Sequence, residues 1–387
     1  MIFHPRLRSP TGCTSLLLAA ILLAGGCRQV RQSENGLRLN QYAFVTNGKS
    51  NSVSVVDLTT FRVVQTVPVG SDPSGVTASP IRNEVYVVNT ASGSVSVLNA
   101  ETLRVASTVQ VGRSPFSLEL SPDGETGFVA NSASDTVSVM NLTARRITQT
   151  IPVGRSPGSL RAAPDGKILV VSNRGSDSIS IIELDTMTVA AEVPVGSQPG
   201  PITILPDSSQ AFVANAGSAS VSAVDLRSRK LLAHLETGRT PTSLALKPDG
   251  GELFVTNFDS DSLSIVNTYA DEVAQSLRAG KNPSQAVVDS SGSLLFFTNF
   301  GSNTVSIVEI NSRQVLASLE VGAQPDTMAL TPDGRYLLVL GSQSNDLAVV
   351  DAARRSLLTV VPLGQRPRAI ATKVFEAPAE GQPQPAR

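Results

Sequence analysis

Residues 42–58 read YAFVTNGKSNSVSVVDL, and this stretch returns along the chain at a constant spacing. Its asparagine recurs every 42 residues (89 − 47 = 42), and in the eighth copy Gly341 takes the same place. A strict period of this length is typical of stacked supersecondary units, each of which needs its neighbours to bury its apolar faces. The seven asparagines are Asn47, Asn89, Asn131, Asn173, Asn215, Asn257 and Asn299.

Each repeat contains four short segments of alternating apolar residues, separated by turn residues such as the Pro-Asp-Gly at 122–124. This pattern predicts a four-stranded antiparallel meander. In one repeat the predicted strands cover residues 116–120, 126–130, 136–140 and 147–153. The repeated asparagine is predicted to bond backbone groups where the second strand ends, which is a structural role.

The ends of the second strands resemble a known motif. FVTN at 44–47, VYVVN at 85–89, FVTN at 254–257 and FFTN at 296–299, with the flanking SPDG and PVGxxP elements, are similar to the repeats of YVTN β-propeller proteins. The resemblance covers about residues 40–374. It implies an all-β propeller and a place in the microbial cell envelope or surface layer, and it implies little about activity.

The number of blades differs from the seven that are common in that family. The chain holds eight copies of each strand, begins on a second strand at Gln41 and finishes on an innermost strand at Arg368 to Lys373. We therefore expect one propeller of eight four-stranded blades, in which the last strand completes the first blade as a 3+1 clasp. Seven blades with an unpaired remainder is the alternative.

Residues 1–26 read as a signal peptide, with Arg6 and Arg8 ahead of a short apolar run. The sequence Leu-Ala-Gly-Gly-Cys that ends at Cys27 resembles the bacterial lipobox, which implies a lipid on Cys27 and a membrane-anchored tether over residues 27–39. The alternative is a secreted protein in which Cys27 is incidental. Residues 375–387 are rich in Pro, Ala and Gln and are predicted to be disordered.

The composition argues against several kinds of site. The net charge is −1, there are two Cys and two His, and Trp is absent. Two Cys and two His cannot build a disulfide framework, a zinc cluster or a multi-histidine copper site. His234, the only histidine beyond the signal peptide, lies in a predicted outermost strand, which argues against a Ser-His-Asp triad. We predict no catalytic residues, metal or cofactor.

The loops that join successive repeats read Gly-x-x-Pro throughout, and they are expected to share one face with the loops between second and third strands. Cations gather in both loop sets, which suggests a basic ring that captures an anion at the channel mouth. The alternative is a solvated surface whose cations pair with nearby aspartates. Phe116, Phe258 and Phe300 add apolar contact at this mouth or pack in the core. The cations are Arg113, Arg155, Arg239, Lys281 and Arg366, with Lys49 and Arg174 from the second set.

Two pairs of opposite charge occupy equivalent positions on adjacent innermost strands. They are Glu119 with Arg161 and Asp326 with Arg368. Each pair is expected to form an ion pair in the channel, with either a structural or a ligand-binding role.

Three functions are consistent with these observations. The first is a monomeric, non-catalytic envelope lipoprotein that binds a protein or an anionic ligand on its loop face. The second is a lactonase-like propeller hydrolase, which a convergent acidic cluster would favour. The third is a periplasmic binder of nucleic acid or another polyanion, which a continuous positive surface would favour.

Overall fold

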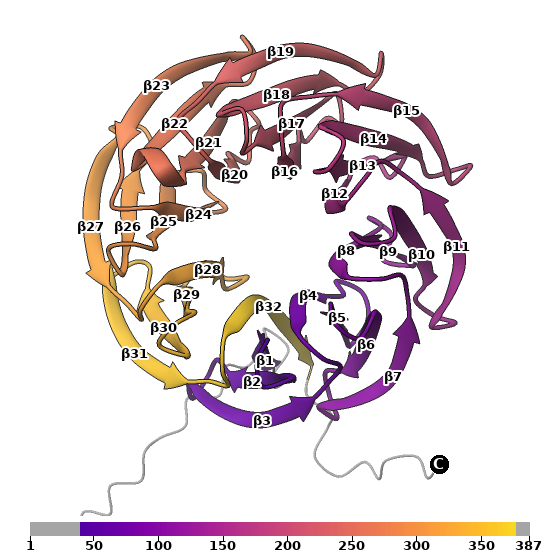
Figure 1. The fold of residues 1–387 in the computed structure, drawn as a ribbon. Coiled ribbons are helices and arrows are strands. Elements are labelled where there is room, and N and C mark those ends of the chain that lie inside the picture. The colour runs from indigo at the N-terminus through magenta and orange to yellow at the C-terminus, as the bar shows by residue number, and fades with distance from the viewer. Residues whose placement is uncertain (1–38, 377–387) are drawn as a thin grey trace, which may run out of the picture.

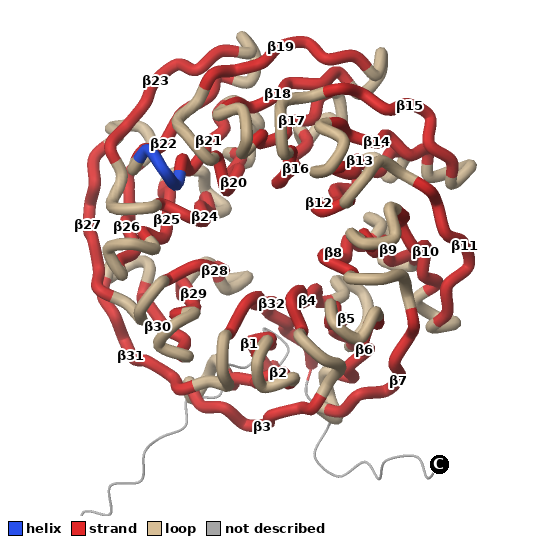
Figure 2. Tube along the Cα trace, viewed as in Figure 1, coloured by secondary structure: helices blue, strands red, loops and turns tan. Residues whose placement is uncertain are grey.

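The computed structural model describes residues 39–376, and within them 32 strands form eight four-stranded antiparallel sheets. The sheets stand as blades in a ring around a central axis (Figures 1 and 2). The prediction of an eight-bladed β-propeller is therefore confirmed, and the seven-bladed alternative is wrong. The signal peptide, Cys27 and residues 377–387 lie outside the described residues.

The blades are numbered from the N-terminus, and each runs from its innermost strand to its outermost. Blade 1 consists of β32 (Pro367–Glu376), β1 (Leu39–Asn47), β2 (Ser52–Asp57) and β3 (Arg62–Pro68). Blade 2 is β4 (Pro73–Ala78), β5 (Glu84–Asn89), β6 (Ser94–Asn99) and β7 (Arg104–Gln110). Blade 3 is β8 (Pro115–Leu120), β9 (Thr126–Asn131), β10 (Thr136–Asn141) and β11 (Arg146–Pro152). Blade 4 is β12 (Pro157–Ala162), β13 (Ile168–Asn173), β14 (Ser178–Glu183) and β15 (Thr188–Pro194).

The other four blades repeat this order. Blade 5 is β16 (Pro199–Ile204), β17 (Gln210–Asn215), β18 (Ser220–Asp225) and β19 (Lys230–Glu236). Blade 6 is β20 (Pro241–Leu246), β21 (Glu252–Asn257), β22 (Ser262–Asn267) and β23 (Glu272–Arg278). Blade 7 is β24 (Pro283–Val288), β25 (Leu294–Asn299), β26 (Thr304–Glu309) and β27 (Gln314–Glu320). Blade 8 is β28 (Pro325–Leu330), β29 (Tyr336–Gly341), β30 (Asp346–Asp351) and β31 (Ser356–Pro362).

A single 3₁₀ turn, η1 (Phe258–Ser260), joins β21 to β22. Across residues 39–376, no helix has the length and apolar character that crossing a membrane requires.

The ring closes through the predicted clasp, because β32 from the C-terminus pairs antiparallel with β1 from the N-terminus. The pairing extends beyond the expected ends of both strands. It begins with Leu39 opposite Glu376 and continues to Asn47 opposite Pro367. Residues 375 and 376 therefore belong to β32 and not to the tail, and Leu39 belongs to β1 and not to the tether. The physical reason is Phe375, which is buried and whose ring lies 5.9 Å from that of Tyr42.

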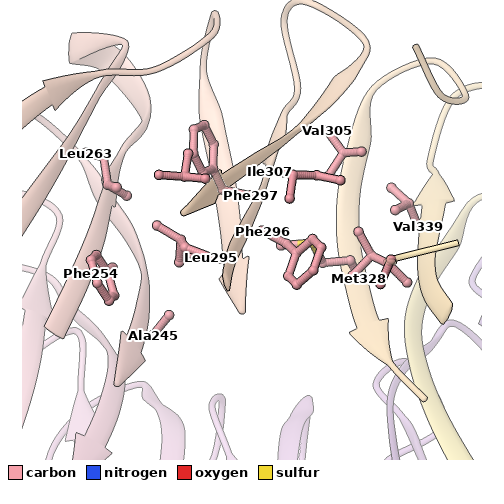
Figure 3. Packing of buried hydrophobic residues seen from close by; sticks show 14 of the residues in the cluster. Ala245, Phe254, Leu263, Leu295, Phe296, Phe297, Val305, Ile307, Met328 and Val339 are labelled. Atoms are coloured by element: carbon pink, nitrogen blue, oxygen red, sulfur yellow. The ribbon is translucent and has the colours of Figure 1, made fainter. Parts of the chain in front are cut away.

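The core lies between the blades, because alternate residues of each strand point to opposite neighbours. In β25, Leu295 points toward blade 6, and Phe296 points toward Met328 of blade 8 (Figure 3). The second and third strands of the blades are almost wholly buried, whereas the outermost strands are largely exposed. A radial arrangement thus buries both faces of every sheet, as the repeat of short apolar strands predicted.

The repeated asparagines form a buried hydrogen-bond network that differs from the predicted backbone cap. In blade 1, Asn47 Nδ2 donates to Ser52 Oγ at 3.2 Å and to Ser54 Oγ at 2.9 Å on β2. All seven asparagines make the equivalent pair of bonds to hydroxyls. Two of them also accept from a loop backbone N–H, that of Gly112 or Gly280. The role is structural, as expected, but most of the partners are side chains.

Both predicted loop sets lie on one face of the ring. Backbone bonds join them, for example from Ala133 N to Arg113 O, which links the loop between β9 and β10 to the Gly-x-x-Pro loop before β8. The residue before each loop proline has a positive φ, such as 47° at Ser114 and 56° at Arg366. These loops form the face on which the channel opens.

Candidate functional site

A cavity of about 920 Å³ opens on the loop face at one side of the channel mouth. Its wall comes from blades 8, 1, 2 and 3, with Phe300 reaching in from the loop after β25. The side chains that define its chemistry are Lys49, Arg366 and Arg368 of blade 1, Ser74 of blade 2, Phe116 of blade 3 and Asp326 of blade 8.

The cavity is lined by innermost-strand residues that differ from those at the equivalent position of the other blades. The second residue of the innermost strands is small in five blades: Ser74, Gly158, Gly200, Thr242 and Ser284. In the other three it is Phe116, Asp326 or Arg368, and all three line the cavity. A small residue is sufficient for the fold at this position. The larger side chains therefore point to a role in the cavity.

The acid partner of Arg368 is Asp72, not the predicted Asp326. Arg368 Nη2 lies 2.9 Å from Asp72 Oδ1, in the loop before β4. Gly48 makes this approach feasible, because a Cβ at Gly48 would lie 2.8 Å from Arg368 Nε. The sequence could not identify this pair, because Asp72 lies in a loop and Arg368 in a strand of the neighbouring blade.

Asp326 is the one carboxylate in the cavity wall, and no described residue forms an ion pair with it. Its side chain reaches the water of the channel, but surrounding protein reduces its solvation. This desolvation raises the pKa of the Asp326 carboxyl, while the charges of Arg366 and Arg368 oppose that rise.

Two cations of the cavity form no ion pair in the described part of the chain. Within residues 39–376, neither Lys49 nor Arg366 makes an ion pair, and both are exposed at the rim of the cavity. With Arg368 they place three positive charges around a hollow whose wall contains only one carboxylate. An anion in this hollow would meet a guanidinium and an ammonium that form no ion pair of their own.

The structure does not bring the predicted basic ring together. Arg366 and Lys49 line the main cavity, whereas Arg113 lines a separate hollow with Ser134. Arg239 Nη2 donates to the Asp259 carbonyl oxygen at 2.8 Å, and Arg174 Nη2 donates to Gln198 Oε1 at 3.4 Å. Arg155 and Lys281 are exposed on other loops of the same face and are not part of the cavity wall.

Glu119 and Arg161 lie deeper in the channel, on β8 and β12. Arg161 Nη1 is 3.4 Å from Glu119 Oε1, which also accepts a bond from the Ala162 backbone N–H at 3.3 Å. Burial raises the pKa of the Glu119 carboxyl, and the Arg161 charge opposes this. Neither residue lines the cavity, so the contact joins two blades and does not add to the candidate site.

Phe116, Phe258 and Phe300 differ in their contacts with the cavity. Phe116 is 58% exposed and lines the cavity. Phe300 also lines it, but its ring lies 5.7 Å from the ring of Phe258, and Phe258 is not part of the wall. Phe116 is therefore the aromatic side chain that is most available to a ligand.

His234 is not part of the cavity wall. His234 lies on outermost strand β19, where its Nδ1 is 2.9 Å from Ser222 Oγ. Among residues 39–376, no three His, Cys, Asp or Glu side chains are close enough together to hold a metal ion.

Comparison with known sequences places the chain among propeller proteins. A sequence profile described as YNCE-like beta-propeller matches residues 77–378, more than half of the chain. A second profile, described as a seven-bladed lactonase propeller, matches residues 3–146. No curated protein sequence gives a significant match.

Solved structures share the architecture at low sequence identity. Hydrazine synthase of Kuenenia stuttgartiensis is 21% identical with a TM-score of 0.57, covering 68% of this chain and 95% of that one. The dihydro-heme d1 dehydrogenase NirN in complex with DHE is 16% identical with a TM-score of 0.74, covering 85% of this chain and 74% of that one. At these identities the similarity concerns the fold alone.

Proposed function

The chain belongs to the YNCE-like β-propeller family, and from this premise we propose that it is a non-catalytic binding protein of the bacterial cell envelope. The proposed site is the cavity at the channel mouth, and the proposed ligand class is a small anion. The propeller acts as a monomeric scaffold that holds three cations from one blade around this cavity.

The proposal rests on one observation: Lys49, Arg366 and Arg368 line a cavity to which residues 39–376 contribute a single carboxylate, Asp326. The two unpaired cations attract an anion, and Arg368 is oriented by its contact with Asp72. Charge-assisted bonds from guanidinium groups favour carboxylate and phosphate because the planar donors match the acceptor oxygens.

Binding of inorganic phosphate and of acetate, measured by isothermal titration calorimetry, tests this site. Arg366→Gln should weaken the binding of either anion at least tenfold, because a hydrogen bond to a charged group contributes about 1.5–3 kcal/mol. Arg155→Gln is the matched control: Arg155 is exposed in an equivalent loop, outside the cavity wall. Equal losses in the two variants would favour a distributed basic ring, and tight binding of a single-stranded oligonucleotide would favour the polyanion function.

The envelope location is proposed from Cys27 and the apolar segment before it. Acyl chains on this cysteine would anchor the mature protein to a membrane. Radiolabelled palmitate should enter the wild-type protein in bacterial cells and not the Cys27→Ala variant. Label in both proteins, or in neither, would contradict the lipoprotein assignment.

A lactonase-like hydrolase is the second candidate, favoured by the lactonase profile over residues 3–146. Asp326, the only carboxylate in the cavity wall, would be its acid or base. Hydrolysis of a small lactone that Asp326→Asn abolishes would establish this activity. Hydrolysis at the uncatalysed rate by the wild-type protein would exclude it for that lactone.

A further inference from the structure

The cavity contains a gap between a cation and an aromatic ring. Around the mouth, the second residues of three successive innermost strands are Arg368 on β32, Ser74 on β4 and Phe116 on β8. Strand β4 lies between β32 and β8 (Figure 1). Because the serine side chain is short, it leaves space between the guanidinium on one side and the phenyl ring on the other.

The phenyl ring has no aromatic partner in the described part of the chain. Phe116 is 58% exposed, and no ring contact joins it to another aromatic side chain of residues 39–376. Phe300, across the cavity, is already packed against Phe258. An exposed phenyl ring that faces a binding cavity is a natural stacking surface for a flat ligand.

The hydroxyl groups beside Phe116 are already engaged within the protein. Ser117 Oγ donates to the Gly158 carbonyl oxygen at 2.5 Å, and Thr77 Oγ1 donates to the Leu118 carbonyl oxygen at 3.1 Å. Ser74 Oγ accepts a hydrogen bond from Thr90 Oγ1 at 2.7 Å. The hydroxyl hydrogens of Ser117 and Thr77 are therefore not free to bond the hydroxyls of a sugar ring, and the wall beside Phe116 suits a hydrocarbon ring.

From these contacts, we infer that the cavity takes a small carboxylic acid carried on a hydrocarbon ring, aromatic or alicyclic. The carboxylate faces Arg368 and Arg366, and the ring lies over Ser74 against Phe116. This inference depends on the proposed anion site and names its ligand class. The cavity, about 920 Å³, is large enough for substituents on the ring.

The probe for this inference is 4-fluorobenzoate, whose binding is followed by fluorine NMR, with acetate and glucuronate as competitors. The wild-type protein should bind 4-fluorobenzoate about tenfold more tightly than acetate, because the ring adds an aromatic contact. Phe116→Ser introduces the residue that blade 2 has at this position. It should remove most of this preference and leave the affinity for acetate within about twofold. Tyr269→Ser changes an exposed aromatic residue outside the cavity and should leave both affinities unaltered.

The possible results separate this inference from the proposal on which it depends. If acetate and 4-fluorobenzoate bind with equal affinity and both bindings are lost in Arg366→Gln, the inferred hydrocarbon ring is wrong, but the proposed anion site is supported. Tighter binding of glucuronate than of 4-fluorobenzoate would show that the inferred ligand class is wrong and that the cavity prefers a sugar acid. Binding of none of the three acids, in a protein with an unchanged melting temperature, would overturn both.

Discussion

Asn131 and Gly112 fix each other's position at the loop face. Asn131 Oδ1 accepts a hydrogen bond from the Gly112 backbone N–H at 2.9 Å, and the Cβ that Gly112 lacks would lie 2.5 Å from Asn131 Cγ. The same close approach recurs at the other six asparagines. In seven of the eight Gly-x-x-Pro loops, the glycine is therefore required by the asparagine that packs on it.

Gly112→Ala should destabilise the propeller by about 1–3 kcal/mol, because the new methyl group overlaps the Asn131 side chain. The free energy of unfolding in urea measures this effect. Gly200→Ala is the control, since the nearest atom to its added Cβ would be the Ala214 carbonyl oxygen at 3.9 Å. That variant should be neutral or more stable by up to about 1 kcal/mol. Equal losses in both variants would refute the packing explanation.

Blade 8 lacks the asparagine network, because Gly341 replaces the asparagine and Asp346 and Ala348 replace the two hydroxyl residues. Asp346 Oδ1 is buried without a hydrogen-bond partner, and burial raises the pKa of this carboxyl. A Cβ at Gly341 would overlap Ser344 Oγ and lie 2.5 Å from Asp346 Oδ1. Gly341→Asn alone should therefore be destabilising.

Combining Gly341→Asn with Asp346→Ser and Ala348→Ser should reverse that loss and exceed the wild-type stability by about 1 kcal/mol, because two hydrogen bonds form and the buried, unbonded Oδ1 of Asp346 is removed. Thermal and urea unfolding of the single and triple variants measure the coupling between the sites. A triple variant that is no more stable than the single one would show that blade 8 does not accept the network.

The clasp depends on Phe375, which is 7% exposed and packs against Tyr42. Phe375→Ala should lower the free energy of unfolding by about 3 kcal/mol, since a buried ring is removed next to a strand that pairs the two ends of the chain. Hydrogen exchange in β1 and β32 should accelerate more than in blade 5. If hydrogen exchange accelerates equally in all blades, the pairing of β1 with β32 is not the least stable part of the propeller.

Lys373 predicts a pH dependence of stability. Lys373 is 7% exposed and its ammonium donates to the Ser79 carbonyl oxygen at 2.5 Å, and burial lowers the pKa of the amine. The unfolded chain then binds the proton more tightly than the folded one, so the free energy of unfolding rises with pH until the amine is neutral in both states. The Lys373→Met variant has no amine at this position, so its free energy of unfolding lacks this pH-dependent contribution.

The stability of the wild-type protein relative to Lys373→Met should therefore increase as the pH rises from neutral toward the ordinary lysine pKa of 10.5. Urea unfolding of both proteins at several pH values in this range gives the difference directly. A difference that stays constant or decreases would show that the amine is as well solvated in the folded protein as in the unfolded chain.

The fold was predictable because its determinants are local and repeated: the strand alternation, the turn residues and the count of eight units all lie in the sequence. The cavity was harder to predict, because it depends on which loops converge. Arg366 and Arg155 occupy similar loops, and only the structure distinguishes the one that lines the cavity. The useful sequence signal was departure from the repeat, as at Phe116, Asp326 and Arg368. The ion pair of Arg368 with Asp72 joins two blades, and the strand register does not reveal it.

The proposed function requires that anions bind in one cavity of the loop face and not all around the channel. Anomalous diffraction from crystals soaked in selenate would locate bound anions directly. The strongest peak should lie among Lys49, Arg366 and Arg368, with weaker or no peaks at Arg113, Arg155 and Arg239. Peaks of equal height around the loop face, or none in the cavity, would contradict the account.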